Sequence, residues 1–308
     1  MKAAVISEFK SDPTVEEIPD PEPGEGEVVV DVEYASINGM DVMTWNGGID
    51  GMMPFEFPIT MGRDFSGTVA AVADGVTNWA VGDAVFGQVL TMPLHEGTFA
   101  EKVRVPAATI AKRPEGLSAK DAGALGLAGG ASRSVMAAIG LTGGETVLVS
   151  GATGGVGSLV IQQAKAAGAT VLATALPDEA DYVRGLGADE VIDRSGDVAA
   201  AVRALRPDGV DVAVHLAGDP SVLASLVASG GRMASSLGFG PTQAGRDDIT
   251  ATPIQTIPNA EVLDGLAADV VSGALKVPVT TTYPLAEVGK ALAEFAGGAT
   301  GKVSVTIR

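Results

Sequence analysis

Residues 146–174 read TVLVSGATGGVGSLVIQQAKAAGATVLAT. A β-branched run at 146–150 leads into a glycine-rich turn, followed by apolar residues at helical spacing and a second β-branched run. Ala152, Gly154 and Gly157 occupy the three positions of the G-x-G-x-x-G pattern, with alanine at the first. Within a strand–turn–helix–strand unit, this pattern predicts a dinucleotide site with the pyrophosphate at the helix N-terminus. A tight turn that binds no ligand is the alternative interpretation.

The chain has 308 residues, enough for about two domains. Its 38 acidic and 20 basic residues give a net charge of −18, which argues against nucleic acid or an anionic membrane as a partner. No apolar run approaches the length of a membrane span, and the N-terminal sequence MKAAVISEFK does not resemble a signal peptide. Because there is no cysteine, disulfides and thiolate chemistry are excluded. We expect a cytoplasmic protein.

The first third of the chain is predicted to be β-rich. Short strands bounded by glycine turns, without a sustained helical period, indicate a barrel or sandwich. The strands are expected at 2–7, 27–36, 65–73, 84–90 and 98–111. Ser118, with Asp121 three residues later, is expected to begin a helix.

From residue 146 onward strands and helices alternate, which predicts a parallel sheet with helices on both faces. The strands are expected at 146–150, 170–174, 190–193, 210–216 and 232–236. The helices are expected at 156–167, 178–186, 198–205 and 222–228, with Gly168, Gly187 and Gly230 ending three of them. A last helix at 260–273 and a strand at 302–307 follow.

Motifs along the chain resemble those of one enzyme family. Residues 35–41, ASINGMD, resemble its A-S-x-N-P-x-D stretch with glycine in place of proline, and residues 58–67, PITMGRDFSG, resemble its P-x-x-x-G-x-D-x-x-G stretch. Its other blocks correspond to GDAVFG at 82–87, GTFAE at 97–101, the Ala152 fingerprint, LGAD at 186–189 and GKV at 301–303. In this order they resemble the medium-chain dehydrogenase/reductase superfamily, and within it the zinc-independent, zeta-crystallin-like quinone oxidoreductases.

The resemblance implies an α/β fold in which a Rossmann doubly wound parallel sheet is inserted into a chaperonin-10-like β-barrel domain. The barrel domain, which binds the substrate, would comprise residues 1–118 and 258–308, and the Rossmann domain residues 119–257. Relatives bind the cofactor in the cleft between the two domains. They commonly pair through the edge strand of the Rossmann sheet, expected here within 248–256, so we expect a homodimer.

Zinc-dependent relatives carry cysteine where Asn38 stands and histidine where Arg63 stands. A catalytic zinc normally takes three protein ligands, mostly histidine and cysteine. The chain has no cysteine, and its only histidines are His95 and His215, which we interpret as structural. No metal site is therefore expected.

Cofactor choice depends on the end of the second Rossmann strand. Ala175 and Leu176 follow it, so the acidic residue with which NAD-specific sites bind the ribose is missing there. Asp178 and Glu179 are interpreted as complementing the N-terminus of the next helix. Arg194 stands where relatives often have a phosphate-contacting tyrosine, and we expect it to bind the 2′-phosphate of NADP(H). A solvated surface arginine is the alternative.

The resemblance implies a set of cofactor-binding residues at the fingerprint, at the ends of neighbouring strands and near the C-terminus. They are Ala131, Ser132, Ala152, Thr153, Gly154, Gly155, Val156, Gly157, Thr174, Ala175, Arg194, Leu216, Ala217 and Lys302.

By the same resemblance, Asn38 and Asp41 are the catalytic residues near the nicotinamide. Asn38 is expected to hydrogen-bond the substrate oxygen or the carboxamide, and Asp41 to orient the local loop; Asn-Gly turn chemistry is the alternative. Relatives that reduce enones or enoyl thioesters often carry a tyrosine where Ile49 stands, and relatives have a threonine where Ala131 stands. We therefore find no dedicated proton donor.

The expected function is that of an NADPH-dependent, zinc-independent reductase of quinones or α,β-unsaturated carbonyl compounds. A 2-enoyl thioester reductase would need a basic patch for coenzyme A phosphates, for which Lys112 and Arg113 are weak candidates. A weakly catalytic NADP(H)-binding sensor or interaction protein is the alternative outside enzymes, because the usual polar groups are missing.

Overall fold

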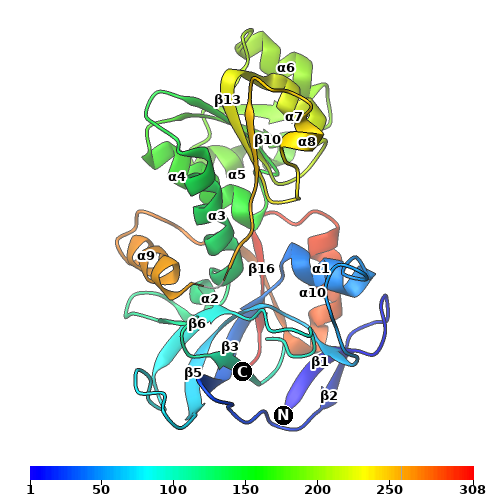
Figure 1. The fold of residues 1–308 in the computed structure, drawn as a ribbon, viewed down its shortest axis with the longest axis vertical. Coiled ribbons are helices and arrows are strands. Elements are labelled where there is room, and N and C mark those ends of the chain that lie inside the picture. The colour runs from blue at the N-terminus through cyan, green and yellow to red at the C-terminus, as the bar shows by residue number, and fades with distance from the viewer. Residues whose placement is uncertain (258) are drawn as a thin grey trace. The chain divides into compact units, whose positions relative to one another are not determined.

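A computed structural model describes residues 1–257 and 259–308 (Figure 1). The chain forms two compact units. The terminal unit, Met1–Gly130 with Ile257–Arg308, contains both chain ends, and the inserted unit is Ala131–Thr256. Pro258, where the predicted second segment of the barrel domain begins, lies outside the described residues. The predicted domain limits stay a prediction.

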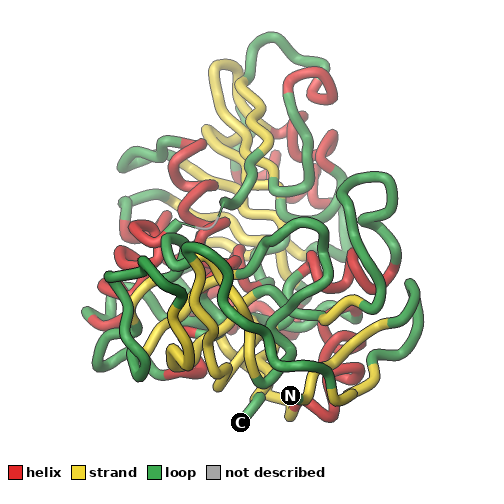
Figure 2. The backbone as a smooth tube through the Cα atoms, turned by 60° about the horizontal axis from the view of Figure 1, so that its bottom comes forward, coloured by secondary structure: helices red, strands yellow, loops and turns green. Residues whose placement is uncertain are grey.

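The inserted unit is built on six parallel strands in the order β11-β10-β9-β12-β13-β14, which lie side by side (Figure 2). They are β9 (Thr146–Ser150), β10 (Thr170–Ala175), β11 (Glu190–Asp193), β12 (Val210–His215), β13 (Val227–Ser235) and β14 (Thr250–Pro253). The chain starts at the centre, runs to one edge and then to the other, which is the doubly wound order. The predicted parallel sheet is confirmed, and β14 lies at one edge, within the segment 248–256.

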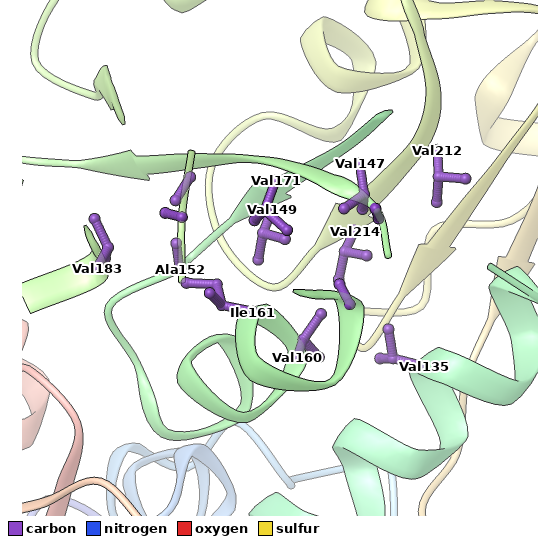
Figure 3. Close-up of a cluster of buried hydrophobic side chains, with 14 of the residues drawn as sticks. Val135, Val147, Val149, Ala152, Val160, Ile161, Val171, Val183, Val212 and Val214 are labelled. Atoms are coloured by element: carbon purple, nitrogen blue, oxygen red, sulfur yellow. The ribbon is translucent and has the colours of Figure 1, made fainter. Parts of the chain in front are cut away.

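Helices cover this sheet because its strands are apolar on both faces. On one face Val149 lies in a cluster with Val160 and Ile161 of α4 (Figure 3). On the other face its neighbour Leu148 lies in a cluster with Val202 of α6, as the two-residue period of a strand requires. The helices are α3 (Gly126–Ile139), whose residues up to Gly130 belong to the terminal unit, α4 (Gly155–Ala166), α5 (Ala180–Gly185), α6 (Val198–Leu205), α7 (Pro220–Leu226) and α8 (Pro241–Ala244), with a 3-10 turn at Pro177–Glu179.

The terminal unit contains a small sheet, β2-β1-β4, and a larger one, β15-β16-β3-β5-β6-β8, with β7 also paired to β3. The strands are β1 (Lys2–Ile6), β2 (Thr14–Glu17), β3 (Glu27–Ser36), β4 (Ile59–Thr60), β5 (Asp64–Val72), β6 (Ala84–Gln88), β7 (Lys102–Pro106), β8 (Ala111–Lys112), β15 (Val279–Pro284) and β16 (Lys302–Thr306). The helices are α1 (Gly39–Asn46), α2 (Ala119–Ala122), α9 (Ala260–Val271) and α10 (Val288–Ala296), with a 3-10 turn at Leu285–Glu287. Because β16 pairs with β3, the C-terminal strand lies beside the N-terminal segment (Figure 1).

Several helices differ from the predictions. The helix predicted at 222–228 ends at Leu226 because β13 begins at Val227, so Gly230 lies within a strand and does not end a helix. α1, α3, α8 and α10 are not among the predicted helices. In α3 the helical signal is weakened by glycines, one of which is required by packing: a Cβ on Gly126 would lie 2.4 Å from the Gly87 carbonyl oxygen. Across the described ranges, no helix combines the length and apolar character needed to cross a membrane.

Candidate functional site

The glycine fingerprint lies between the carboxyl end of β9 and the N-terminus of α4. A Cβ on Gly157 would lie 2.2 Å from the Gly151 carbonyl oxygen, so only glycine lets the helix approach the turn this closely. Gly154 is the N-cap of α4, and within this fully described segment no side chain caps the helix. A Cβ on Gly154 would meet only the Gly151 oxygen, at 3.6 Å, so space is open there. This uncapped N-terminus fits a pyrophosphate.

The loop after β12 lies against this turn. The Cβ position of Gly151 is 3.0 Å from Cβ of Leu216 and 3.2 Å from Cβ of Ala217. Ser150 Oγ donates a hydrogen bond of 2.6 Å to the carbonyl oxygen of Ala217. The structure thus brings Leu216 and Ala217 next to the fingerprint, at the carboxyl edge of the sheet, where doubly wound folds bind ligands.

Arg194 and Ala175 meet at the ends of β11 and β10, where the Arg194 N–H donates to the Ala175 carbonyl oxygen at 3.0 Å. The Arg194 guanidinium lies 3.4 and 3.5 Å from the two carboxylate oxygens of Glu179. One of these oxygens also accepts the Leu176 N–H at 2.7 Å, so Glu179 caps the turn after β10. The arginine remains 44% exposed, and a negative charge stands beside it.

The other predicted cofactor-binding residues of the inserted unit are more buried than Arg194. Ser132, on α3, is buried and accepts a hydrogen bond of 2.8 Å from Gln163 Nε2 on α4. The remaining ones are mostly buried at the fingerprint and its neighbouring elements: Ala131, Ala152, Thr153, Gly155, Val156 and Thr174. Asn38, Asp41 and Lys302 belong to the terminal unit, where the structure brings them together.

Ser36, Asn38, Asp64 and Lys302 form a buried polar cluster in the terminal unit. Lys302 Nζ lies 2.6 Å from Asn38 Oδ1, 3.0 Å from the Ile37 carbonyl oxygen and 3.3 Å from Asp64 Oδ2. Asp64 Oδ2 also accepts from Ser36 Oγ at 2.7 Å and from Asn38 Nδ2 at 2.9 Å. Asn38 Nδ2 donates further to the Ser36 carbonyl oxygen at 3.3 Å. The Asn38 amide is therefore engaged within the unit, and a donor contact to a substrate oxygen would have to replace one of these bonds.

Asp41 lies in the first turn of α1, and its Oδ2 accepts the Asn38 N–H at 2.8 Å. Burial raises the pKa of Asp41 to about 6, while the positive charge of Arg63 opposes that shift. Burial also lowers the pKa of the Arg63 guanidinium, whose Nη1 donates to the Glu96 carbonyl oxygen at 3.1 Å. The sequence interpretation used Arg63 only as an argument against zinc and missed this buried charge. Its only signal is the arginine inside the PITMGRDFSG motif.

The residues at the relatives' zinc positions do not suit a metal ion. Lys302 Nζ already lies among the oxygens of Asn38 and Asp64, and Arg63 adds a second positive charge nearby in the same unit. In residues 1–257 and 259–308, no group of three or more His, Cys, Asp or Glu side chains could hold a metal. His95 instead donates from Nδ1 to the Glu56 carbonyl oxygen at 3.1 Å. This donor set does not fit the nitrogen and sulfur ligands of a zinc site.

Known protein families and individual relatives match most of the chain. A family profile described as "Alcohol dehydrogenase GroES-like domain" matches residues 24–115, and one described as "Zinc-binding dehydrogenase" matches residues 155–256. The chain is 33% identical over 307 residues to the chloroplast envelope quinone oxidoreductase homolog of Arabidopsis thaliana, covering 94% of this chain and 92% of that protein.

Two solved structures are similar to this chain over almost their full length. The quinone oxidoreductase from Coxiella burnetii has a TM-score of 0.91 at 27% identity, covering 100% of this chain and 99% of that one. An NAD-dependent alcohol dehydrogenase has a TM-score of 0.89 at 27% identity, covering 100% of both chains.

The Lys302→Met variant tests the buried polar cluster. Methionine fills a similar volume but leaves the Asp64 carboxylate buried without its cation, so we expect a loss of about 3–5 kcal/mol in the free energy of unfolding. Lys290→Met removes an exposed lysine paired with Glu287, and should cost at most about 1 kcal/mol. Adding Asp64→Asn to Lys302→Met should restore part of the loss. Denaturant unfolding measures all three; equal costs for the two lysine variants would contradict the assignment.

The raised pKa of Asp41 predicts that the free energy of unfolding depends on pH. Because its folded pKa is raised from 3.8 to about 6, its stabilising contribution is complete below pH 3.8 and is lost as pH rises through about 6. The wild type should therefore lose roughly 3 kcal/mol across this window relative to Asp41→Asn, at about 1.4 kcal/mol per pKa unit. Asp50→Asn, at an exposed position of the same segment, is the control. If the wild-type and Asp41→Asn curves run parallel, Asp41 does not titrate as described.

Proposed function

Because this chain belongs to the medium-chain dehydrogenase/reductase superfamily, among its quinone oxidoreductase-like members, we propose that it reduces quinones or α,β-unsaturated carbonyl compounds with NADPH and without zinc. The family establishes that the protein is an oxidoreductase of the nicotinamide-dependent kind, and that its fold combines a GroES-like domain with a Rossmann domain. The observation that carries the proposal is the similarity to quinone oxidoreductases over the full length, together with the uncapped helix N-terminus at the fingerprint.

The inserted unit supplies what the cofactor requires. The first N–H groups of α4 would hold the pyrophosphate, and Leu216 and Ala217 would line the site beside Gly151. When bound, the nicotinamide supplies the hydride, and the protein contributes binding and orientation. In the terminal unit, Asp41 would fix the loop before α1 through the Asn38 N–H.

Zinc independence is supported by the chemistry of the side chains at the zinc positions. Asn38 and Arg63 replace the relatives' cysteine and histidine, and Lys302 supplies a fixed positive charge instead of a metal ion. Asn38 already accepts from this ammonium at 2.6 Å, so its orientation is set within the protein. We propose that this cluster holds Asn38 and the start of α1 in place for the acceptor.

A quinone is the acceptor that these residues suit best. Ile49 stands where relatives carry a tyrosine, and it is fully buried in the core of the terminal unit. Hydride addition to a quinone gives a stabilised hydroquinone anion, which water can protonate in a later step. A simple enone needs an oriented proton donor in the transition state, and such donors typically contribute about 10² to 10⁴ in rate. We therefore propose that quinones are reduced faster than simple enones.

The thioester alternative has less support. Its candidate for binding coenzyme A phosphates was Lys112 with Arg113, but Arg113 Nη2 is paired with Glu33 at 3.1 Å. The negative charge of Glu33 offsets the attraction of this arginine for a phosphate.

The homodimer and the cytoplasmic location stay predictions. β14 forms the edge of the inserted unit's sheet, and an edge strand with unpaired backbone groups can pair with a second copy.

A panel of acceptors tests the proposed reaction. NADPH oxidation should be fastest with a quinone, slower with a simple enone and slowest with a 2-enoyl thioester, and exhaustive chelation should leave the rates unchanged. Metal analysis of the purified protein is expected to show no stoichiometric zinc. Activity that disappears on chelation and returns with zinc would refute zinc independence. Tight NADPH binding without oxidation by any acceptor would favour the sensor.

Substitution of Arg194 tests whether the protein prefers NADPH to NADH. A hydrogen bond between arginine and phosphate contributes roughly 1.5–3 kcal/mol, so Arg194→Ala should weaken NADPH binding roughly ten- to a hundredfold and leave NADH nearly unchanged. Glu179→Gln should tighten NADPH binding, because it removes the carboxylate that competes for the guanidinium. Arg184→Ala, on an exposed arginine of α5, is the control. Equal weakening of both cofactors by Arg194→Ala would make this arginine structural.

A further inference from the structure

His215 ends β12 and is only 2% exposed. Its Nδ1 lies 2.8 Å from Oγ of Ser235, the last residue of the neighbouring strand β13. Its Nε2 lies 3.2 Å from the carbonyl oxygen of Gly218. The imidazole therefore links the loop that follows β12 to the turn that follows β13. Both segments leave the sheet at its carboxyl edge, where the glycine fingerprint also lies.

The hydrogen bonds fix the protonation state of this ring. A carbonyl oxygen only accepts, so the contact with Gly218 requires a hydrogen on Nε2. Nδ1 of the neutral ring then accepts from the Ser235 hydroxyl. Ser235 Oγ in turn accepts the N–H groups of Leu237 at 3.1 Å and Phe239 at 3.3 Å. The hydroxyl thus uses its hydrogen and both of its lone pairs, and every partner is satisfied only when His215 is neutral.

The segment held by the ring is the one beside the fingerprint. Leu216 and Ala217 lie against Gly151, and Ser150 Oγ holds the Ala217 carbonyl oxygen at 2.6 Å. His215 Nε2 holds the next carbonyl oxygen along the chain, that of Gly218. Two consecutive carbonyl groups of this loop are therefore fixed by side chains at the ends of β9 and β12.

We propose that neutral His215 is a positioning residue of the nucleotide site that ties the segment 216–218 to the turn after β13, and that its protonation breaks this tie at Ser235 and weakens cofactor binding. The inference rests on the proposed function, because it assumes that the fingerprint binds a nucleotide. In the imidazolium form Nδ1 becomes a donor that faces Ser235 Oγ, whose lone pairs already accept from Leu237 and Phe239. One of these hydrogen bonds must break to accommodate the cation.

The surroundings of the His215 ring determine the direction in which its pKa is shifted. Burial lowers the pKa of His215, while the Gly218 carbonyl and the charge of Asp219, on the turn before α7, act in the opposite direction. Ser150 of β9 and Ser235 of β13 are the residues paired with His215 in the sheet. The ring of Phe239 lies edge-on to the imidazole, with 6.3 Å between the two ring centroids. These side chains do not titrate. His215 is therefore neutral at pH 7, and cofactor affinity should fall as the pH drops below the ordinary histidine range.

A ¹⁵N titration of the wild-type imidazoles tests the ring arrangement without any cofactor. The chain has two histidines, and His95→Gln assigns the two sets of signals. His215 should carry its hydrogen on Nε2, and its pKa should lie below the ordinary histidine value. A hydrogen on Nδ1, or a charged ring at pH 7, would overturn the proposal.

Dissociation constants measured between pH 5 and 8 test the link to binding. The probes are NADPH and NADH, and the proteins are the wild type, His215→Gln and, as a control, His95→Gln. Glutamine at 215 can still donate to Gly218 but cannot be protonated. The ratio of wild-type to His215→Gln dissociation constants should rise as the pH falls, by up to about tenfold per pH unit for one linked proton. Titration of the cofactor's own phosphate cancels in this ratio.

A ratio that stays constant with pH would overturn the proposal while leaving nucleotide binding intact. Ser235→Ala provides a second variant, because it removes the acceptor for Leu237 and Phe239. It should weaken both cofactors roughly three- to tenfold at pH 7.5, and unchanged affinity would count against the inference. If the wild type binds neither cofactor at any pH, the proposed function fails together with this inference.

Discussion

The ammonium of Lys302 and the carboxylate of Asp64 lie 3.3 Å apart and are almost completely withdrawn from solvent. A buried ion pair is tolerated only where hydrogen bonds satisfy its remaining atoms. Here Asn38, the Ile37 carbonyl, the Ser36 hydroxyl and the Leu127 N–H do so. These groups come from β16, β3, β5, α3 and the start of α1. One charge pair thus ties the C-terminal strand to a segment 238 residues earlier in the chain and orients Asn38.

The candidate site of the inserted unit is built differently from the buried polar cluster of the terminal unit. Backbone groups line it, and side chains hold that backbone in position. Gly151 and Gly157 allow the turn and α4 to approach each other, and the helix N-terminus is left open to an anion. Ser150 and His215 fix the loop after β12, and Glu179 caps the turn after β10. A phosphate bound there would be held mainly by backbone N–H groups rather than by particular side chains. Under the proposed function, exposed groups such as Arg194 would set the cofactor preference.

The sequence predicts the inserted unit better than the details of the site. Alternation of β-branched runs with helical stretches predicted β9 to β12 and α4 closely, because strands buried on both faces must be apolar throughout. α3 was missed because its glycines serve close packing rather than helix propensity, and α1 because it begins at an Asn-Gly pair, which is typical of turns. The family resemblance singled out Asn38, Asp41 and Lys302. Neither local pattern nor spacing shows that Lys302 contacts Asn38 and Asp64, or that Arg63 is buried, since these facts depend on long-range strand pairing.

Membership of this family implies that the protein moves a hydride from a nicotinamide cofactor to an acceptor. Single-turnover oxidation of NADPH by a quinone, with deuterium at one or the other face of the nicotinamide C4, tests it most directly. We predict that deuterium on one face slows cofactor oxidation and that deuterium on the other face leaves it unchanged, because a protein site holds the ring in one orientation. Oxidation at the same rate with either label, or no oxidation in the presence of any quinone, would contradict the account.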